Sequence, residues 1–169
     1  MLKERVEKAL NEQITEEFTA SQLYLAMASW AETNGLEGTA NFLYAHSEEE
    51  REHALKLYHY INDRGGHAIT PKLEQPEYNY DSIDKVFKDI MAHEKQVSEK
   101  INNLVGICLE EKDYTTNNFL QWYVEEQIEE ENLFGNLLDK LEMLGDHKGK
   151  TYLFDNELGK AAAADTAAE

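Results

Sequence analysis

Apolar residues recur at intervals of three and four positions over four long stretches of the chain, the spacing that places them on one face of an α-helix. These stretches cover residues 2–33, 37–65, 82–111 and 114–144. A shorter helix is predicted over residues 150–159. No stretch alternates apolar and polar residues as a half-buried strand does, so the pattern predicts an all-α protein.

The connection over residues 66–81 differs from its surroundings because it holds both prolines of the chain. In extended form it spans roughly 53 Å, whereas a helix of about thirty residues is ~45 Å long. It can therefore run the length of a bundle, which makes the helices on either side of it parallel. The other connections are only a few residues long and join antiparallel neighbours. The prediction is a four-helix bundle with one long crossover between the second and third helices, plus a short fifth C-terminal helix.

The composition indicates one soluble globular domain, since 30% of the 169 residues are charged and 41% are hydrophobic. We assign residues 1–160 to this domain and expect the Ala-rich tail, residues 161–169, to be disordered. Acidic residues outnumber basic ones 34 to 16, which gives a formal net charge of −18. Such a chain repels nucleic acid and anionic membranes, so neither is an expected partner. The expected partners are cations.

The chain offers no sign of export or membrane insertion. Cys108 is the single cysteine, which excludes a disulfide within the chain. The first residues, MLKERVEKAL, carry charges throughout and contain no apolar targeting segment. No run is long enough to span a membrane. The expected location is the cytoplasm.

Polar residues interrupt the apolar face of each long helix near its middle. The interrupting residues are Glu17 in the first helix, Glu50 and His53 in the second, Glu94 in the third, and Gln127 and Glu130 in the fourth. The midpoints of equal helices lie at one level of a bundle, whichever way each helix runs. We therefore expect four carboxylates, one imidazole and one amide to converge in the core.

Four carboxylates buried together are unfavourable, because they lose hydration and repel one another. Two divalent cations balance their four negative charges. Oxygen ligands with one imidazole suit Fe(II), Mn(II) or Zn(II) rather than soft copper. A carboxylate-bridged pair of redox-active metals can also give one electron from each metal to the same dioxygen molecule. The sequence thus predicts a buried dinuclear site.

The pattern Glu17, Glu50-x-x-His53, Glu94 and Gln127-x-x-Glu130 resembles the di-iron ferroxidase centre of the bacterial non-haem ferritins. The segments NEQITEEF, EEEREH and NFLQWYVEEQIEEE are similar to that family, and the resemblance covers the chain except for the Ala-rich tail. Ferritin-like bundles commonly carry a second Glu-x-x-His. The departure at Gln127 favours a ferritin over a bacterioferritin and predicts one weaker metal position without histidine. Haem is not expected, because Glu52 occupies the position where the bacterioferritin haem ligand would be.

Three further glutamates, Glu49, Glu126 and Glu129, each precede a residue of the interrupted seams. One residue is a turn of about 100° in a helix, so these side chains point beside the pair rather than into it. The resemblance implies a third iron site here, toward the interior of a protein shell. The alternative is an acidic surface facing solvent.

Tyr24 lies two turns from Glu17 on the same helix face, where packing in the core would suffice to explain it. The resemblance implies instead a tyrosine that hydrogen-bonds to the ligand carboxylates and supplies an electron during catalysis. Trp122 lies nearby in the fourth helix and is a weaker candidate donor. His46, one turn before Glu50, is compatible with support of the ligands or with core packing.

The resemblance implies iron storage. Fe(II) would bind at the pair and be oxidised by O₂ or H₂O₂, and Fe(III) would accumulate as ferric oxyhydroxide inside a homo-oligomeric shell of twenty-four subunits. Two alternatives remain open at this stage. One is a non-storage di-iron oxidase or peroxidase, and the other is a redox-inactive shell subunit that buffers metal.

Overall fold

The computed structural model of this chain describes residues 2–165 and contains five helices and no strand over that range. The helices are α1 (Glu4–Thr33), α2 (Glu37–Asp63), α3 (Ile83–Glu110), α4 (Tyr114–Leu144) and α5 (Lys150–Asp165). The predicted four-helix bundle with an additional C-terminal helix is confirmed. The four long helices begin and end within two residues of the predicted boundaries.

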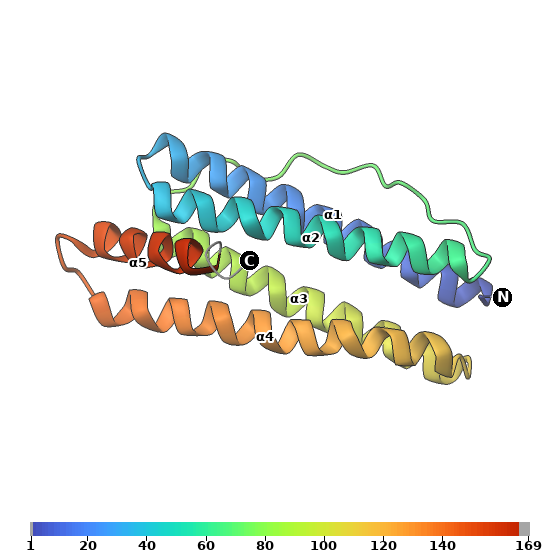
Figure 1. Ribbon diagram of the computed structural model, residues 1–169. Helices are drawn as coiled ribbons and strands as arrows, with labels where there is room; N and C mark the ends of the chain where they lie inside the picture. Colours follow the sequence, from blue (N-terminus) through green and yellow to red (C-terminus); the bar gives the residue numbers. More distant parts are fainter. Residues whose placement is uncertain (1, 166–169) are drawn as a thin grey trace.

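Two antiparallel hairpins, α1–α2 and α3–α4, form the bundle, and the long connection runs beside it from the end of α2 to the start of α3 (Figure 1). Helices α2 and α3 are therefore parallel, as predicted. The crossover ends at Ser82, whose Oγ accepts a hydrogen bond from the Lys85 amide at 3.2 Å and caps α3. The α1–α2 turn passes through Gly35, whose φ of +74° is a conformation that other residues rarely adopt.

The fifth helix is longer than predicted, because it ends at Asp165 rather than at residue 159. Alanine has the highest helix propensity of all residues, so the Ala-rich segment continues the helix. Residues 161–165 of the tail expected to be disordered therefore belong to α5. Residues 166–169 lie outside the described range. Phe154 and Leu158 are buried and anchor α5 to the bundle.

The apolar core is divided into two clusters, one toward each end of the bundle. The cluster on the α5 side contains Tyr24, Leu43, Phe87, Phe134, Phe154 and Leu158, among others. The opposite cluster contains Leu10, Ile14, Leu57, Ile101, Leu120 and Tyr123, among others. A layer of buried polar residues separates them at mid-length. Within residues 2–165, no helix is long and apolar enough to cross a membrane.

Candidate metal centre

The polar layer receives side chains from all four long helices, at the level that the sequence predicts. Its glutamates are almost fully buried, with exposed fractions of 1% for Glu17, 4% for Glu50, 1% for Glu94 and 6% for Glu130. His53 is 6% exposed. Aspartate and glutamate are rarely buried to this extent unless they are paired with a cation or hydrogen-bonded.

Glu17, Glu50 and His53 form a group in this layer whose three members are all buried. One ligand atom from each lies within 4.8 Å of the others. Glu50 and His53 lie on one face of α2 because they are three residues apart, and the Glu50 Oε2 to His53 Nδ1 distance is 3.3 Å. Two carboxylates and one imidazole at this separation can hold a first divalent cation.

Glu94 and Glu130 occupy the α3–α4 side of the layer. The Tyr24 hydroxyl donates to Glu94 Oε1 at 2.7 Å, and Gln127 Nε2 donates to Glu94 Oε2 at 3.2 Å. The buried Oε2 of Glu130 has no hydrogen-bond partner among the described residues. A buried carboxylate oxygen without a partner is costly, and a cation beside it would remove that cost.

Burial and mutual repulsion raise the pKa values of Glu17, Glu50 and Glu130 in this layer. Loss of hydration and the neighbouring Glu50 charge raise the pKa of Glu17 well above its usual range. Burial and the Glu94 charge do the same for the pKa of Glu50, and they raise the pKa of Glu130 to about 8. The raised pKa values of Glu17, Glu50 and Glu130 favour the protonated carboxyl groups in the metal-free layer, and a cation that binds must displace those protons.

Gln127, expected as a metal ligand, acts here as a hydrogen-bond donor. Its Nε2 contacts the backbone oxygen and Oε2 of Glu94, each at 3.2 Å, and Ser98 Oγ at 3.3 Å. The amide nitrogen has no lone pair for a metal, so these contacts orient Glu94. They leave the Gln127 carbonyl oxygen as its only group suited to a cation.

The structure brings together two of the three glutamates expected at a third site. Ligand atoms of Glu49, Glu126 and His53 lie within 4.8 Å of one another, and Glu49 also groups with His46 and Glu130. Glu49 therefore reaches both halves of the central layer. Glu129 is exposed and belongs to neither group, although its charge raises the pKa of Glu126 after the larger effect of burial.

Three contacts that position the side chains of this layer were not predicted from the sequence. Gln13 Nε2 donates to Glu17 Oε1 at 2.9 Å, and Tyr123 OH donates to the backbone oxygen of His53 at 2.7 Å. His46 Nδ1 lies 3.0 Å from the Phe42 backbone oxygen. The four-residue interval from Gln13 to Glu17 is a signal that could have revealed the first contact, since such residues are neighbours on a helix.

The two candidate electron donors differ in their surroundings. Tyr24 is fully buried, and burial together with the Glu94 charge raises its pKa well above its usual range. Trp122 packs edge-on against His53 with 5.1 Å between ring centroids. Lys56 Nζ lies 3.3 Å from the centroid of the Trp122 ring, so a positive charge covers this indole.

Known proteins share both the fold and the sequence over most of this length. The ferritin-like domain family matches residues 7–144, and the chain belongs to that family. A Haemophilus influenzae protein named as a probable bacterial non-heme ferritin-like protein is 48% identical over 159 residues, covering 94% of this chain and 96% of that protein. A Campylobacter jejuni bacterial non-heme ferritin is 45% identical and covers 96% of this chain and 97% of its own.

Solved structures agree with these sequence relatives. An open-pore ferritin from the hyperthermophilic archaeon Archaeoglobus fulgidus aligns with a TM-score of 0.91 and 37% identity, covering 94% of this chain and 98% of that one. An engineered closed form of the Archaeoglobus fulgidus ferritin aligns equally well, at 36% identity. The resemblance inferred from the sequence motifs is thus confirmed at the level of the family.

Proposed function

We propose that this chain is the subunit of an iron-storage ferritin with ferroxidase activity. The observation that carries the proposal is the buried group of Glu17, Glu50 and His53 together with the Glu130 oxygen that has no hydrogen-bond partner within residues 2–165. Relatives named as non-heme ferritins support the assignment to iron. Carboxylate oxygens with one imidazole suit Fe(II) chemically.

Two Fe(II) ions are the proposed substrates. Glu17, Glu50 and His53 would hold one, while Glu94 and Glu130 would hold the other, with Glu50 between them. The carboxylates release their protons as the cations bind, so that four negative charges balance four positive ones. Loss of one electron from each Fe(II) reduces one O₂ to the level of peroxide, or reduces one H₂O₂ together with two protons to two water molecules, and leaves two Fe(III).

Glu49, Glu126 and Glu129 form the proposed third iron site. Hard carboxylate oxygens favour Fe(III), so this position would receive oxidised iron from the pair. Tyr24 would supply an additional electron, with its hydroxyl hydrogen-bonded to Glu94 as a path for the proton. The proposed assembly is a homo-oligomeric shell of twenty-four subunits that stores Fe(III) as ferric oxyhydroxide.

The decisive experiment adds Fe(II) aerobically to the iron-free protein and follows ferric absorbance together with particle size. Glu50→Ala and His53→Ala should each abolish rapid oxidation, a larger effect than the roughly 10- to 100-fold loss typical of residues that only support a metal ligand. Glu52→Ala is the matched control, because Glu52 is exposed on the same helix.

The outcomes separate the candidate functions. Oxidation at the wild-type rate in both ligand variants would place the reaction elsewhere. Fe(II) binding without oxidation would indicate a metal-buffering subunit. Oxidation without retention of iron in a large particle would indicate a di-iron oxidase that does not store the metal.

A further inference from the structure

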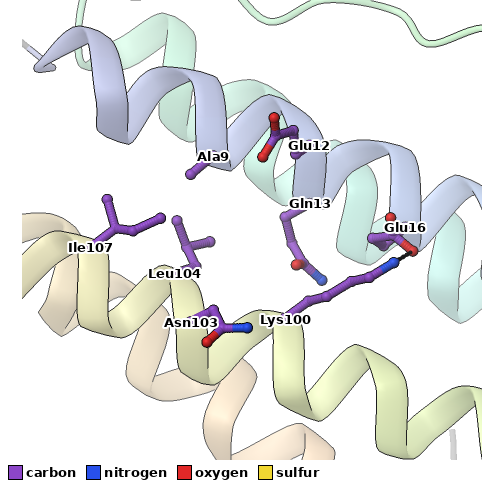
Figure 2. Close-up of a pocket in the computed structure, with 8 residues that line it drawn as sticks. All are labelled: Ala9, Glu12, Gln13, Glu16, Lys100, Asn103, Leu104 and Ile107. Carbon is purple, nitrogen blue, oxygen red and sulfur yellow. Dashed lines mark ion pairs between the residues drawn. The ribbon is translucent and has the colours of Figure 1, made fainter.

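A pocket of about 300 Å³ opens between α1 and α3, beside the polar layer. Its polar lining consists of Glu12, Gln13 and Glu16 from α1 and Lys100 and Asn103 from α3, and the rest of the wall is apolar (Figure 2). A water molecule occupies about 30 Å³ of liquid volume, so this space is large enough for a divalent cation with its six waters. The proposed ferroxidase reaction assigns no role to the pocket.

Gln13 connects the pocket with the centre. Its side chain is only 3% exposed, yet it forms part of the pocket wall. Figure 2 shows its amide pointing into the space between the two helices. The same amide donates to Glu17 Oε1 at 2.9 Å, so one side chain separates the pocket from a proposed metal ligand.

An ion pair lies at the mouth of the pocket. Lys100 Nζ lies 2.5 Å from Glu16 Oε2, and the two side chains are 45% and 23% exposed (Figure 2). Ion pairs that are partly exposed to solvent contribute little stability, so this one can open readily. Glu12 adds a second, more exposed carboxylate beside it. Opening the pair would free the Glu16 carboxylate for a cation.

A histidine nitrogen without a partner lies in the same region. His93 precedes Glu94 in α3, and its Nε2 is buried without a hydrogen-bond partner among the described residues. The ring is near enough to Glu94 of the centre, and to Glu16 and Lys100 of the pocket mouth, for their charges to act on it. The carboxylates of Glu12 and Glu16 line the pocket, and the Gln13 amide in its wall contacts Glu17.

We propose that the α1–α3 pocket is an inlet through which hydrated divalent cations reach the centre, with the Lys100–Glu16 pair as its gate and Gln13 as the last contact before Glu17. The inference rests on the proposed function and adds the direction in which iron crosses the bundle. Glu49 and Glu126 border the centre from α2 and α4. Fe(II) would therefore arrive at one face of the bundle, and Fe(III) would leave at the other.

Co(II) binding to the iron-free assembled protein tests this inlet without any redox step. Stopped-flow absorbance gives the rate and the final amplitude of binding. Lys100→Met should accelerate binding by about two- to fivefold at low ionic strength, and by less as salt is added. Lys95→Met is the matched control, because it removes the same charge from an exposed position on α3 and should leave the rate unchanged.

A second pair of variants tests the pocket by size. Asn103→Trp fills the space and should slow Co(II) binding by about tenfold at full amplitude, whereas Asn103→Ala keeps the pocket open and should bind at the wild-type rate or faster. Wild-type rates in both Lys100→Met and Asn103→Trp would overturn the inlet. Loss of the Co(II) signal in His53→Ala verifies the centre independently, and a retained signal there would contradict the proposed function instead.

Discussion

Glu130 illustrates how position, rather than residue type, decides the behaviour of a single side chain in this protein. Several glutamates of α4 are exposed, but Glu130 is buried between two apolar clusters and beside other carboxylates. The heptad spacing predicts its burial. The spacing does not predict that one of its oxygens has no hydrogen-bond partner in the described part of the chain, because partners across helices depend on how the helices are rotated in the bundle.

The raised pKa of Glu130 predicts how stability depends on pH. Its pKa is about 8 in the folded chain, against roughly 4.3 in an unfolded one. Between these values the folded chain holds a proton that the unfolded chain has lost, so the free energy of unfolding falls as pH rises. The metal-free protein should therefore be less stable at pH 8 than at pH 5.

Glu130→Gln mimics the protonated side chain and should reduce this pH dependence. We expect the Tm of the metal-free variant at pH 8 to exceed that of the wild type by several degrees, since about 2–4 °C corresponds to 1 kcal/mol in a chain of this size. Thermal unfolding at several pH values measures the effect, with the exposed Glu125→Gln as control. An unchanged pH slope would mean that Glu130 is ionised in the empty centre.

Tyr24→Phe tests the proposed electron donor. The variant loses the hydrogen bond to Glu94 and the oxidisable hydroxyl but keeps the ring that packs in the core. Fe(II) oxidation should slow by roughly two- to tenfold, in line with a loss of about 0.5–1.5 kcal/mol for one hydrogen bond. Tyr58→Phe is the control, because the buried Tyr58 hydroxyl has no partner among the described residues. Equal rates in the two variants would remove Tyr24 from the mechanism.

Glu49→Ala combined with Glu129→Ala tests the third site. Two Co(II) or Zn(II) ions per subunit should still bind at the centre, because the variant keeps all the ligands proposed for the pair: Glu17, Glu50, His53, Glu94 and Glu130. The number of irons oxidised rapidly per subunit, and the rate at which the centre recovers, should both change. Unchanged stoichiometry and recovery would identify these glutamates as an acidic surface facing solvent.

At the scale of the helices, the docking of α5 depends on a close approach to α2. Thr39 donates through its amide and its hydroxyl to Asp155 Oδ1, at 2.7 and 2.8 Å. A Cβ on Gly38 would lie 2.0 Å from the backbone oxygen of Asp155, so only glycine permits this contact. The sequence predicts a helix after Gly149, but its contact with the start of α2 joins residues more than one hundred positions apart.

Gly38→Ala should therefore destabilise the protein, by about 1–3 kcal/mol as is typical of overpacking. Gly106→Ala is the matched control within α3, where an added Cβ meets nothing within 4 Å. That variant should gain about 0.5–1 kcal/mol from its better helix propensity. Denaturant unfolding at equal protein concentration compares them, and equal stability of the two variants would contradict the observed docking of α5.

At the scale of the whole molecule, the two apolar clusters hold the polar layer between them. Removing ligands should therefore leave the bundle folded, since neither cluster loses a side chain. The proposed shell should appear as a particle of twenty-four subunits by light scattering at neutral pH and moderate salt. A monomer or dimer under these conditions would contradict the storage function, although not the metal centre.

The sequence by itself determined the five helices, the crossover, the all-α class and the level of the polar layer. Helical periodicity indicates which residues share a face, and helix length indicates how far along the bundle they lie. Only the tertiary structure decided that Gln127 donates to Glu94, that α5 docks at Gly38 and that Gln13 lies between a pocket and Glu17. These contacts depend on the rotation and separation of neighbouring helices, which side-chain packing sets and local periodicity does not.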